Sequence, residues 1–467
     1  MDARVRLLND RPEPDKARHV LYWAQMNRRA DSNHALEFAA ALANRRKLPL
    51  LVYEGLTCTY PHASDRFHQF ILEGVPETAK RLRARGIGYV FYLRRRKKDA
   101  NDVLYRLAND AAGLVTDDYP AFVAAEHNSR VPDRVRVPYY AVDSSCVVPM
   151  RLLEKKEYAA YTIRPKIHRM LDEHMRPVER IVPDLPYRGA PPEFHTEVAE
   201  ESIPALVASC EIDHGVKPSL SFRGGALEAE RRLRLFLEGA LSRYESERNE
   251  PSSHATSNLS PWLHFGHISS LRVALETQLH AAENGLDCGA FLEELIVRRE
   301  LAFNHARLAT RPNSFDELPD WARGTLRKHT RDRRDPIYSR DQFEEARTHD
   351  KLWNATQTEM LLRGKIHGYY RMYWGKKVIE WSATPQEALE TMVYLHDKYA
   401  LDGRDPNTYA NILWCFGLHD RPWKERPVFG MVRYMSLGGM QRKTRVPAYL
   451  DEIRQLELTG EDPYRLQ

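Results

Sequence analysis

Five short apolar runs alternate with segments of helical pattern between residues 18 and 145. The runs are HVLYWA, LPLLVYE, IGYVFYL, AGLVTDD and VPYYAVD, and stretches such as NHALEFAAALANRR separate them. Strands that alternate with helices in this way are typical of a parallel sheet with helices on both faces. The pattern predicts an α/β domain over residues 1–185, built on a doubly wound, five-stranded parallel sheet.

A change in composition divides the chain after this region. Residues 186–225 are rich in proline and glycine, which is typical of a linker. From residue 226 onward the apolar residues follow helical spacing, as in ALEAERRLRLFLEGAL. We therefore predict an all-helical second domain over residues 226–467, with strands returning only in a hairpin near 428–446.

The bulk composition narrows the class of protein. A chain of 467 residues with 42% hydrophobic residues exceeds one ordinary core, and it has no run of about 20 apolar residues that could cross a membrane. The N-terminus, MDARVRLLND, lacks the layout of a secretory signal, so we expect a cytoplasmic protein. Five scattered cysteines predict neither disulfides nor a metal site. The net charge of +5 is compatible with a nucleic-acid partner. No segment indicates an oligomer interface, so we expect a monomer.

The stretch TSNLSPW at 256–262 combines hydroxyl side chains with the start of a helix. Ser260 is a good N-cap residue and Pro261 suits the first helical position. Unpaired amides at such a helix start attract phosphate. An ordinary capped helix and an anion site both fit this pattern.

Seven of the eight tryptophans lie beyond residue 260. Trp374 and Trp381 are seven residues apart, which is two turns of one helix face, and Trp353 is expected on a neighbouring helix. Aromatic residues at helical spacing usually form core, but indoles at this spacing also suit electron hopping. The spacing alone leaves both interpretations open.

Three further groups of residues have both a structural and a functional interpretation. Arg371 lies one turn after His367, and the turn LDGRDPN at 401–407 supplies carboxylates, so we expect an arginine–aspartate pair that joins the helix to the turn or holds a cofactor. Glu294 and Arg298 share a helix face and are expected to form a salt bridge. Trp414 is a core residue or a stacking platform for a base.

Several segments together resemble class II cyclobutane pyrimidine dimer (CPD) photolyases, members of the photolyase/cryptochrome superfamily. They are SNLSPWLHFGHIS, FLEELIVRREL, THDKLWNATQTEM, KIHGYYRMYWGKKVIEWS, LDGRDPNTYANILW and VRYM. The resemblance implies a Rossmann-like α/β domain and a helical domain that holds a bent FAD, active as FADH⁻. It also implies light-driven electron transfer to a pyrimidine dimer flipped out of UV-damaged DNA.

The resemblance assigns cofactor and electron-transfer roles to residues of this chain. The FAD diphosphate is expected at Thr256, Ser257, Asn258, Leu259 and Ser260, with Tyr244 nearby. Arg371 and Asp402 are expected to pair beneath the flavin, with Asp405 close to it. The electron-transfer order from flavin to surface is expected to be Trp374, Trp353, Trp381.

The resemblance also assigns substrate contacts and exposes two departures. Glu294, Arg298, Met372 and Trp414 are expected to line the dimer pocket, and the basic hairpin is expected to bring Arg433, Arg442 and Lys443 to DNA phosphates. His396 stands where the family usually has an asparagine whose amide faces flavin N5, so we expect His396 to face N5 here. Asn411 stands where the family usually has glycine.

Three alternative functions stay open at this stage. A cryptochrome-like photoreceptor would keep FAD and the tryptophans without repair. Repair of (6-4) photoproducts would use pocket histidines, and a non-catalytic nucleic-acid-binding protein would have purely structural tryptophans. The sequence does not identify a second, light-harvesting chromophore.

Overall fold

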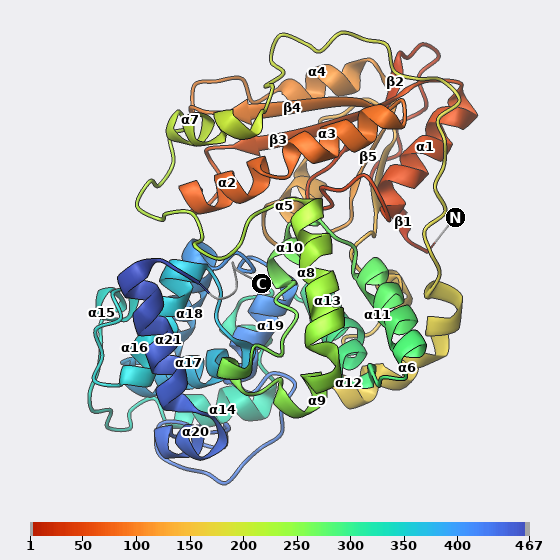
Figure 1. Ribbon diagram of the computed structural model, residues 1–467. Helices are drawn as coiled ribbons and strands as arrows, with labels where there is room; N and C mark the ends of the chain where they lie inside the picture. Colours follow the sequence, from red (N-terminus) through yellow and green to blue (C-terminus); the bar gives the residue numbers. More distant parts are fainter. Residues whose placement is uncertain (1–2, 463–467) are drawn as a thin grey trace.

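A six-stranded sheet forms the core of the N-terminal half in the computed structural model, which describes residues 3–462 (Figure 1). The strand order is β1-β6-β5-β2-β3-β4. The outermost residues of the two predicted domains, 1–2 and 463–467, lie outside the described part. The strands are β1 (Val5–Leu7), β2 (His19–Trp23), β3 (Leu50–Thr57), β4 (Gly88–Arg94), β5 (Ala111–Asp117) and β6 (Tyr139–Val142).

The sheet contains one strand more than the prediction and is not purely parallel. The five predicted strands are present and mutually parallel, but β1 pairs antiparallel with β6, with Val5 opposite Val142. β1 is only three residues long, so it carries too little alternation of apolar and polar residues to be recognised in the sequence. The prediction of five parallel strands therefore missed an antiparallel edge.

Helices cover both faces of the sheet, because alternate side chains of each strand point to opposite faces. In β2, Val20 and Tyr22 belong to the hydrophobic cluster shared with α1 and α3, whereas Leu21 and Trp23 belong to the cluster shared with α4. This arrangement confirms the predicted doubly wound architecture. The helices of this part are α1 (His34–Arg46), α2 (Asp65–Leu72), α3 (Val75–Ala84), α4 (Val103–Asn109) and α5 (Phe122–Arg130).

The segment 186–225 lies along the edge of the sheet. The Thr196 amide donates to the Phe91 carbonyl over 2.8 Å, and the Leu93 amide donates to the Thr196 hydroxyl. The short helix α7 (Ile203–Ala208) packs against α2. The predicted linker thus covers part of the exposed edge of β4, a protection that sheet edges generally require.

The second half is helical, as predicted, and lies below the sheet in Figure 1. One helix from the first half, α6 (Ala160–His174), packs against this region, where Arg164 pairs with Glu293 over 2.7 Å. The remaining long helices are α8 (Ala226–Gly239), α11 (Ser270–Asn284), α13 (Arg299–Leu308), α14 (Asp320–Lys328), α16 (Lys351–Arg363), α17 (Gly368–Trp381), α18 (Pro385–Tyr399), α19 (Pro406–Cys415), α20 (Leu437–Lys443) and α21 (Val446–Thr459). The short helices are η1 (Met150–Leu152), η2 (Glu200–Ser202), η3 (Leu241–Arg243), α9 (Tyr244–Glu247), η4 (Pro251–Ser253), α10 (Ser260–His264), α12 (Gly289–Leu292), the π-helix η5 (Glu293–Arg298), η6 (Phe315–Glu317) and α15 (Arg340–Glu344).

The predicted hairpin near residues 428–446 is wrong. Within the described residues, this region contains one isolated bridge between Arg426 and Gly430, followed by α20. The Ser436 hydroxyl caps α20 by accepting from the Gly439 amide at 3.1 Å. The hairpin was expected because this segment resembles the basic hairpin of the family, but the Ser436 side-chain cap starts a helix there instead.

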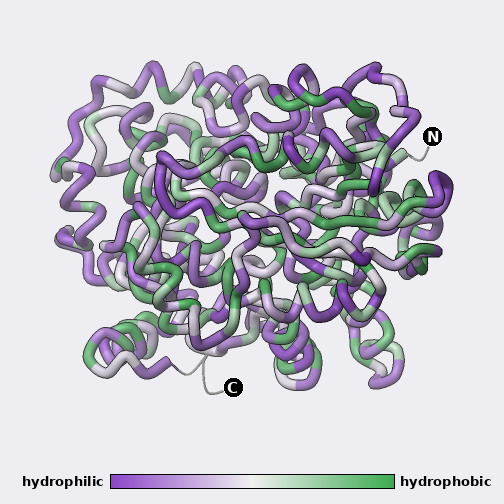
Figure 2. The backbone as a smooth tube through the Cα atoms, turned by 90° about the horizontal axis from the view of Figure 1, so that it is seen from above, coloured by the Kyte–Doolittle hydropathy of each residue, from purple (hydrophilic) through white to green (hydrophobic). Residues whose placement is uncertain are grey.

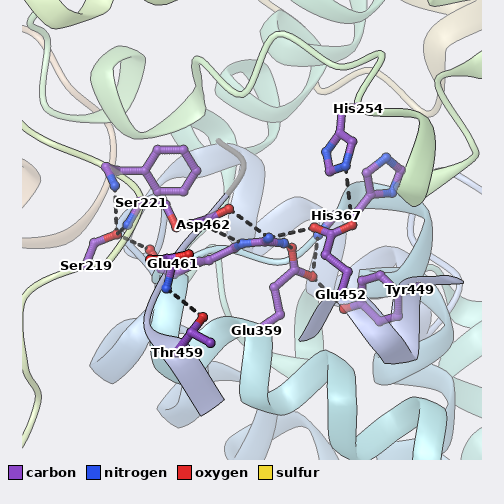
Figure 3. A network of polar contacts seen from close by, with 12 residues as sticks. Ser219, Ser221, His254, Glu359, His367, Tyr449, Glu452, Thr459, Glu461 and Asp462 are labelled. Atoms are coloured by element: carbon purple, nitrogen blue, oxygen red, sulfur yellow. Dashed lines mark hydrogen bonds and ion pairs between the residues drawn. The ribbon is translucent and has the colours of Figure 1, made fainter. Parts of the chain in front are cut away.

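A buried network around Arg363 joins four segments of the chain. Figure 3 shows its members Glu359, Glu452, Asp462 and Ser221 close together. Arg363 on α16 contacts Asp462 at 2.8 Å, Glu452 on α21 at 2.6 Å and Glu359 one turn earlier at 3.2 Å. Asp462 also accepts a hydrogen bond from Ser221. The network therefore ties residues after the last helix to the segment that links the two halves.

Hydrophobic stretches of the chain are short and are interrupted by hydrophilic residues throughout (Figure 2). Across residues 3–462, no helix has the length and apolar character that crossing a membrane would require.

Candidate functional site

A cavity of about 240 Å³ opens among the helices of the second half. Its walls come from the loop before α10, the π-helix η5, the start of α17 and the segment 402–411. The lining residues are Tyr244, Ser257, Leu259, Ser260, Leu263, His264, Phe291, Glu294, Leu295, Arg299, Arg371, Asp402, Asp405, Asn407, Thr408 and Asn411.

The loop before α10 and the first residue of that helix contribute three predicted residues to the wall, Ser257, Leu259 and Ser260. Thr256 and Asn258 do not line the cavity; the Thr256 hydroxyl donates to the Asn258 side chain, and Asn258 has a positive φ of 55°. Ser260 is the first residue of the helix, and Leu259 occupies the N-cap position. The predicted Ser260 cap is therefore wrong. Its hydroxyl donates instead to Asp402 over 2.7 Å, which joins this loop to the opposite wall.

Arg371 and Asp402 form the predicted pair between helix and turn. One terminal nitrogen of Arg371 lies 2.9 and 3.0 Å from the two carboxylate oxygens, and both side chains are largely buried. Burial alone would raise the pKa of Asp402, but the charges of Arg371 and Lys365 and the Ser260 hydrogen bond outweigh it and lower the pKa. Asp402 is therefore ionised at neutral pH.

Asp405 organises a second polar group on the wall. Its carboxylate accepts from Tyr119 of the α/β half at 2.6 Å and from His264 at 3.1 Å. Burial opposes ionisation of Asp405, but the bond and charge of His264 dominate and lower its pKa strongly. The other carboxylate oxygen accepts from the Asn407 side chain at 3.0 Å, so the Asn407 amide on the wall has a fixed orientation.

Several lining residues escaped the sequence analysis. His264 and Asn407 lie inside motifs that were recognised, but no spacing rule separated them from their neighbours. Arg299 lies one residue beyond the predicted Arg298. Tyr119 carries no sequence signal at all, because its partner Asp405 is 286 positions away.

The π-helix changes the pairing of Glu294. A π-helix brings residues five apart together, and Arg298 pairs with Glu293 at 3.3 Å rather than with Glu294. Glu294 lines the cavity, is partly exposed and pairs with Arg248 at 3.2 Å. The expected Glu294–Arg298 salt bridge is therefore absent, although both predicted residues lie in this π-helix.

Two other predicted residues also line the cavity. Tyr244 is 9% exposed, and burial raises the pKa of its phenol to about 12, so the hydroxyl stays protonated. Asn411 is half-buried on α19, one turn after Asn407. Both residues present neutral polar groups to the cavity.

The three tryptophans form a continuous line of rings. Trp374 and Trp353 stack with centroids 5.8 Å apart and planes at 10°, and Trp353 meets Trp381 at 6.3 Å. Trp374 follows the cavity residue Arg371 by three positions on α17. The rings therefore touch one another in the order Trp374, Trp353, Trp381, and Trp374 is the one that shares a helix turn with the cavity residue Arg371.

His396 is not among the residues that line the cavity, but its Nε2 is buried and has no hydrogen-bond partner among the described residues, so its expected position at flavin N5 stays a prediction. His396 is fully buried on α18, where its Nδ1 donates to the Met392 carbonyl at 2.9 Å and its ring meets the Trp374 ring edge-on at 5.1 Å. This hydrogen bond from the imidazole to the backbone carbonyl four residues earlier fixes the orientation of the ring. Burial lowers the pKa of His396 to about 3, so the imidazole is neutral.

Trp414 and Met372 lie close to the cavity without lining it. Trp414 is half-buried on α19, three residues after Asn411, and the Arg298 guanidinium lies 5.8 Å from its ring centre. Met372 adjoins Arg371, and its sulfur lies 3.9 Å from the Cys415 thiol.

The three predicted basic residues do not share one element. Arg433 lies over the Trp423 ring at 4.4 Å and near Asp420 at 3.5 Å. Arg442 and Lys443 are exposed in the last turn of α20.

A second cavity of about 310 Å³ lies between the α/β half and the loop after α10. Trp23, Tyr60 and Phe122 are among its aromatic walls, and Arg28 and Arg404 are among its charged ones. His264 lines both cavities. The described residues contain no cluster of side chains suited to hold a metal ion.

Comparisons with known proteins agree with this arrangement. Residues 20–184 match the family model described as DNA photolyase. The chain is 42% identical over 457 residues to a deoxyribodipyrimidine photo-lyase of Methanothermobacter thermautotrophicus, covering 97% of this chain and 98% of that protein. It is 36% identical to a deoxyribodipyrimidine photo-lyase of Potorous tridactylus, covering 96% of this chain and 84% of that protein.

Two solved structures share the fold at low sequence identity. A cryptochrome of Synechocystis sp. PCC6803 superposes with a TM-score of 0.71 at 14% identity, covering 95% of this chain and 90% of the other. An archaeal photolyase from Sulfolobus tokodaii, whose structure contains two FAD molecules, superposes with a TM-score of 0.64 at 16% identity, covering 96% and 95%.

Proposed function

We propose that this chain, which belongs to the family of deoxyribodipyrimidine photo-lyases, acts as a class II enzyme that uses light to split cyclobutane pyrimidine dimers in UV-damaged DNA. Its fold is that of photolyases and cryptochromes. The observation that carries the proposal is a cavity with the buried Arg371–Asp402 pair in its wall, together with a continuous line of tryptophans that starts on the same helix as Arg371.

FAD is the cofactor that we assign to the first cavity. The Arg371 Nε is buried and has no hydrogen-bond partner within residues 3–462, although Arg371 lines the cavity. A buried donor of this kind needs an acceptor, which the flavin ring offers. When bound and reduced as FADH⁻, FAD supplies on excitation the electron that opens the dimer and receives it back.

The residues of the chain have distinct tasks around this cofactor. The hydroxyl of Ser257 binds the diphosphate end, Ser260 joins this loop to Asp402, and Thr256 and Asn258 shape the loop. The Arg371–Asp402 pair holds the flavin, and Asp405 orients the Asn407 amide toward the cavity. Tyr244, Leu259 and Asn411 complete the walls. These positions keep water out and fix the ring.

The dimer is proposed to contact Glu294, Met372 and Trp414. Glu294 carries a carboxylate at the cavity and is proposed to hydrogen-bond the dimer. Trp414 offers a ring for stacking, and Arg298 above it adds a positive charge. Flipping a damaged step costs less than flipping a normal pair because the step is already poorly stacked.

The remaining surface contacts follow from charge. Arg433, Arg442 and Lys443 are proposed to contact phosphates of the DNA backbone, although they lie on a loop and a helix instead of a hairpin. Counterion release makes such contacts salt-dependent. Replacing Arg442 and Lys443 together by alanine is expected to flatten the salt dependence of DNA binding.

The second cavity is proposed to hold a second chromophore, whose identity the residues do not specify. Its aromatic walls suit a planar ligand, and a protein of the same fold carries two FAD molecules. Chromatography of the pigments released from the purified protein tests this assignment.

The decisive experiment measures repair directly. Irradiated oligothymidine is mixed with photoreduced protein, and the recovery of thymine ultraviolet absorbance is followed under blue light and in darkness. Light-dependent recovery is expected. Bound and reduced FAD without recovery would instead favour a cryptochrome-like photoreceptor.

A further inference from the structure

The tryptophan line ends at a residue that solvent barely reaches. Trp381 is only 4% exposed, and Trp353 and Trp374 are fully buried. An electron hole that stopped on Trp381 would have little contact with an external reductant. The neighbours of Trp381 therefore decide how the charge leaves the protein.

Neither buried indole has a base to take up its proton. The Trp374 N–H donates to the Gln357 amide oxygen at 3.0 Å, and the Trp353 N–H donates to the Trp374 carbonyl at 3.0 Å. Amide oxygens are very weak bases. An oxidised tryptophan at either position stays a cation, and the charge is free to move along the line.

Tyr338 and His349 form a hydrogen-bonded pair against Trp381. The Tyr338 ring meets the Trp381 ring at 5.8 Å, and the Tyr338 amide donates to the Trp381 carbonyl at 2.9 Å. The phenol oxygen accepts from the His349 amide at 2.9 Å and lies 2.8 Å from the His349 Nδ1, to which the phenol donates when the His349 hydrogen is on Nε2. Tyr338 is half-buried and His349 is exposed, so this pair connects Trp381 with solvent.

The charge of Lys377 favours transfer away from Trp381. Its ammonium lies 5.5 Å from the Trp381 ring centre and forms an ion pair with Glu380 at 2.5 Å. A nearby cation disfavours positive charge on the indole. A tyrosine that loses its proton as it is oxidised carries no net charge and avoids this repulsion.

We infer that Tyr338 is the terminal electron donor of the tryptophan line and that His349 accepts its proton, an inference that rests on the proposed function. The Trp381 radical cation, formed during flavin photoreduction, takes one electron from Tyr338. The phenolic O–H bond breaks, and the proton moves to the His349 Nδ1. The products are neutral Trp381, a neutral tyrosyl radical and a His349 imidazolium, which passes its Nε2 proton to water.

The test follows the radicals after a light flash on the FAD-loaded, oxidised protein, by transient absorption and by electron paramagnetic resonance. In the unaltered protein a tryptophan cation radical is expected to give way to a neutral tyrosyl radical, more slowly in D₂O. Tyr338→Phe should lose the tyrosyl signal. His349→Gln keeps a hydrogen-bond acceptor but not a base, and should lose most of that signal too.

Tyr434→Phe is the matched control, because Tyr434 also lies beside Lys377, at 5.0 Å, but makes no ring contact with Trp381 among the described residues. It should behave like the unaltered protein. A tyrosyl radical that survives Tyr338→Phe, or that forms fully in His349→Gln, overturns the inference. A tryptophan radical without any tyrosyl radical overturns this inference alone, whereas the absence of both radicals also overturns the proposed electron path.

Discussion

Replacing Asp402 by asparagine tests the polar centre of the first cavity. Asp402 is the counter-ion of Arg371, lies near Lys365 and accepts from Ser260. Removing one partner of a buried ion pair costs ~3–5 kcal/mol. The asparagine oxygen still accepts from Arg371, so we expect the lower end, about 3 kcal/mol of unfolding free energy.

Denaturant unfolding with and without FAD measures this cost, and FAD titration measures affinity. Because Arg371 loses its fixed position, we expect about a tenfold weaker FAD affinity, which equals ~1.4 kcal/mol. Glu230→Gln is the control, since Glu230 pairs with Arg81 at 2.9 Å and Arg272 at 2.6 Å outside the cavity. It should lower stability but not FAD affinity. An Asp402→Asn protein with unchanged stability and FAD affinity would refute the reasoning.

Three further predictions concern the tryptophans and His396. Trp374→Phe is expected to abolish photoreduction of oxidised flavin, followed by absorbance under illumination, while protein reduced beforehand still repairs dimers; undiminished photoreduction would contradict the electron path. Trp414→Ala is expected to weaken binding of dimer-containing DNA by ~1–3 kcal/mol through lost stacking, with a smaller effect on undamaged DNA in the same titration. His396 has a pKa lowered from 6.5 to about 3, so its protonation favours the unfolded state and stability falls as pH drops from 6.5 toward 3. His396→Asn should therefore make unfolding free energy less steep in that window, by at most about 1.4 kcal/mol per pH unit; an unchanged slope would argue against a neutral buried His396.

The sequence predicted the features that arise from local pattern. The alternation of strands and helices predicted the parallel sheet with helices on both faces, and the spacing of Trp374 and Trp381 placed both rings on one helix. Features that depend on distant partners or on a single added hydrogen bond were missed. The three-residue β1 needs β6 to become a strand, and α20 begins at one serine cap in a segment where a hairpin was expected.

In the candidate site, too, features that arise from local pattern were predicted and features that depend on other contacts were missed. The Arg371–Asp402 pair follows from a helix face and a carboxylate-rich turn, and it is present. The π-helix could not be predicted, because its single inserted residue leaves no mark on apolar spacing, and it moved the partner of Arg298 from Glu294 to Glu293. His396 was placed at flavin N5 by resemblance alone; its Nδ1 donates to its own helix and its buried Nε2 has no partner among the described residues, so this placement stays a prediction.

His264 stands in the wall of both cavities, and this gives their occupants a thermodynamic relation. The His264 Nδ1 is held by a hydrogen bond to Asp405, which also lines the first cavity. Asp405 in turn accepts a hydrogen bond from the Tyr119 hydroxyl of the other half of the chain. A ligand that shifts His264 from either side alters the free energy of binding on the opposite side. Linkage requires the two effects to be equal, so each occupant changes the affinity for the other by the same factor.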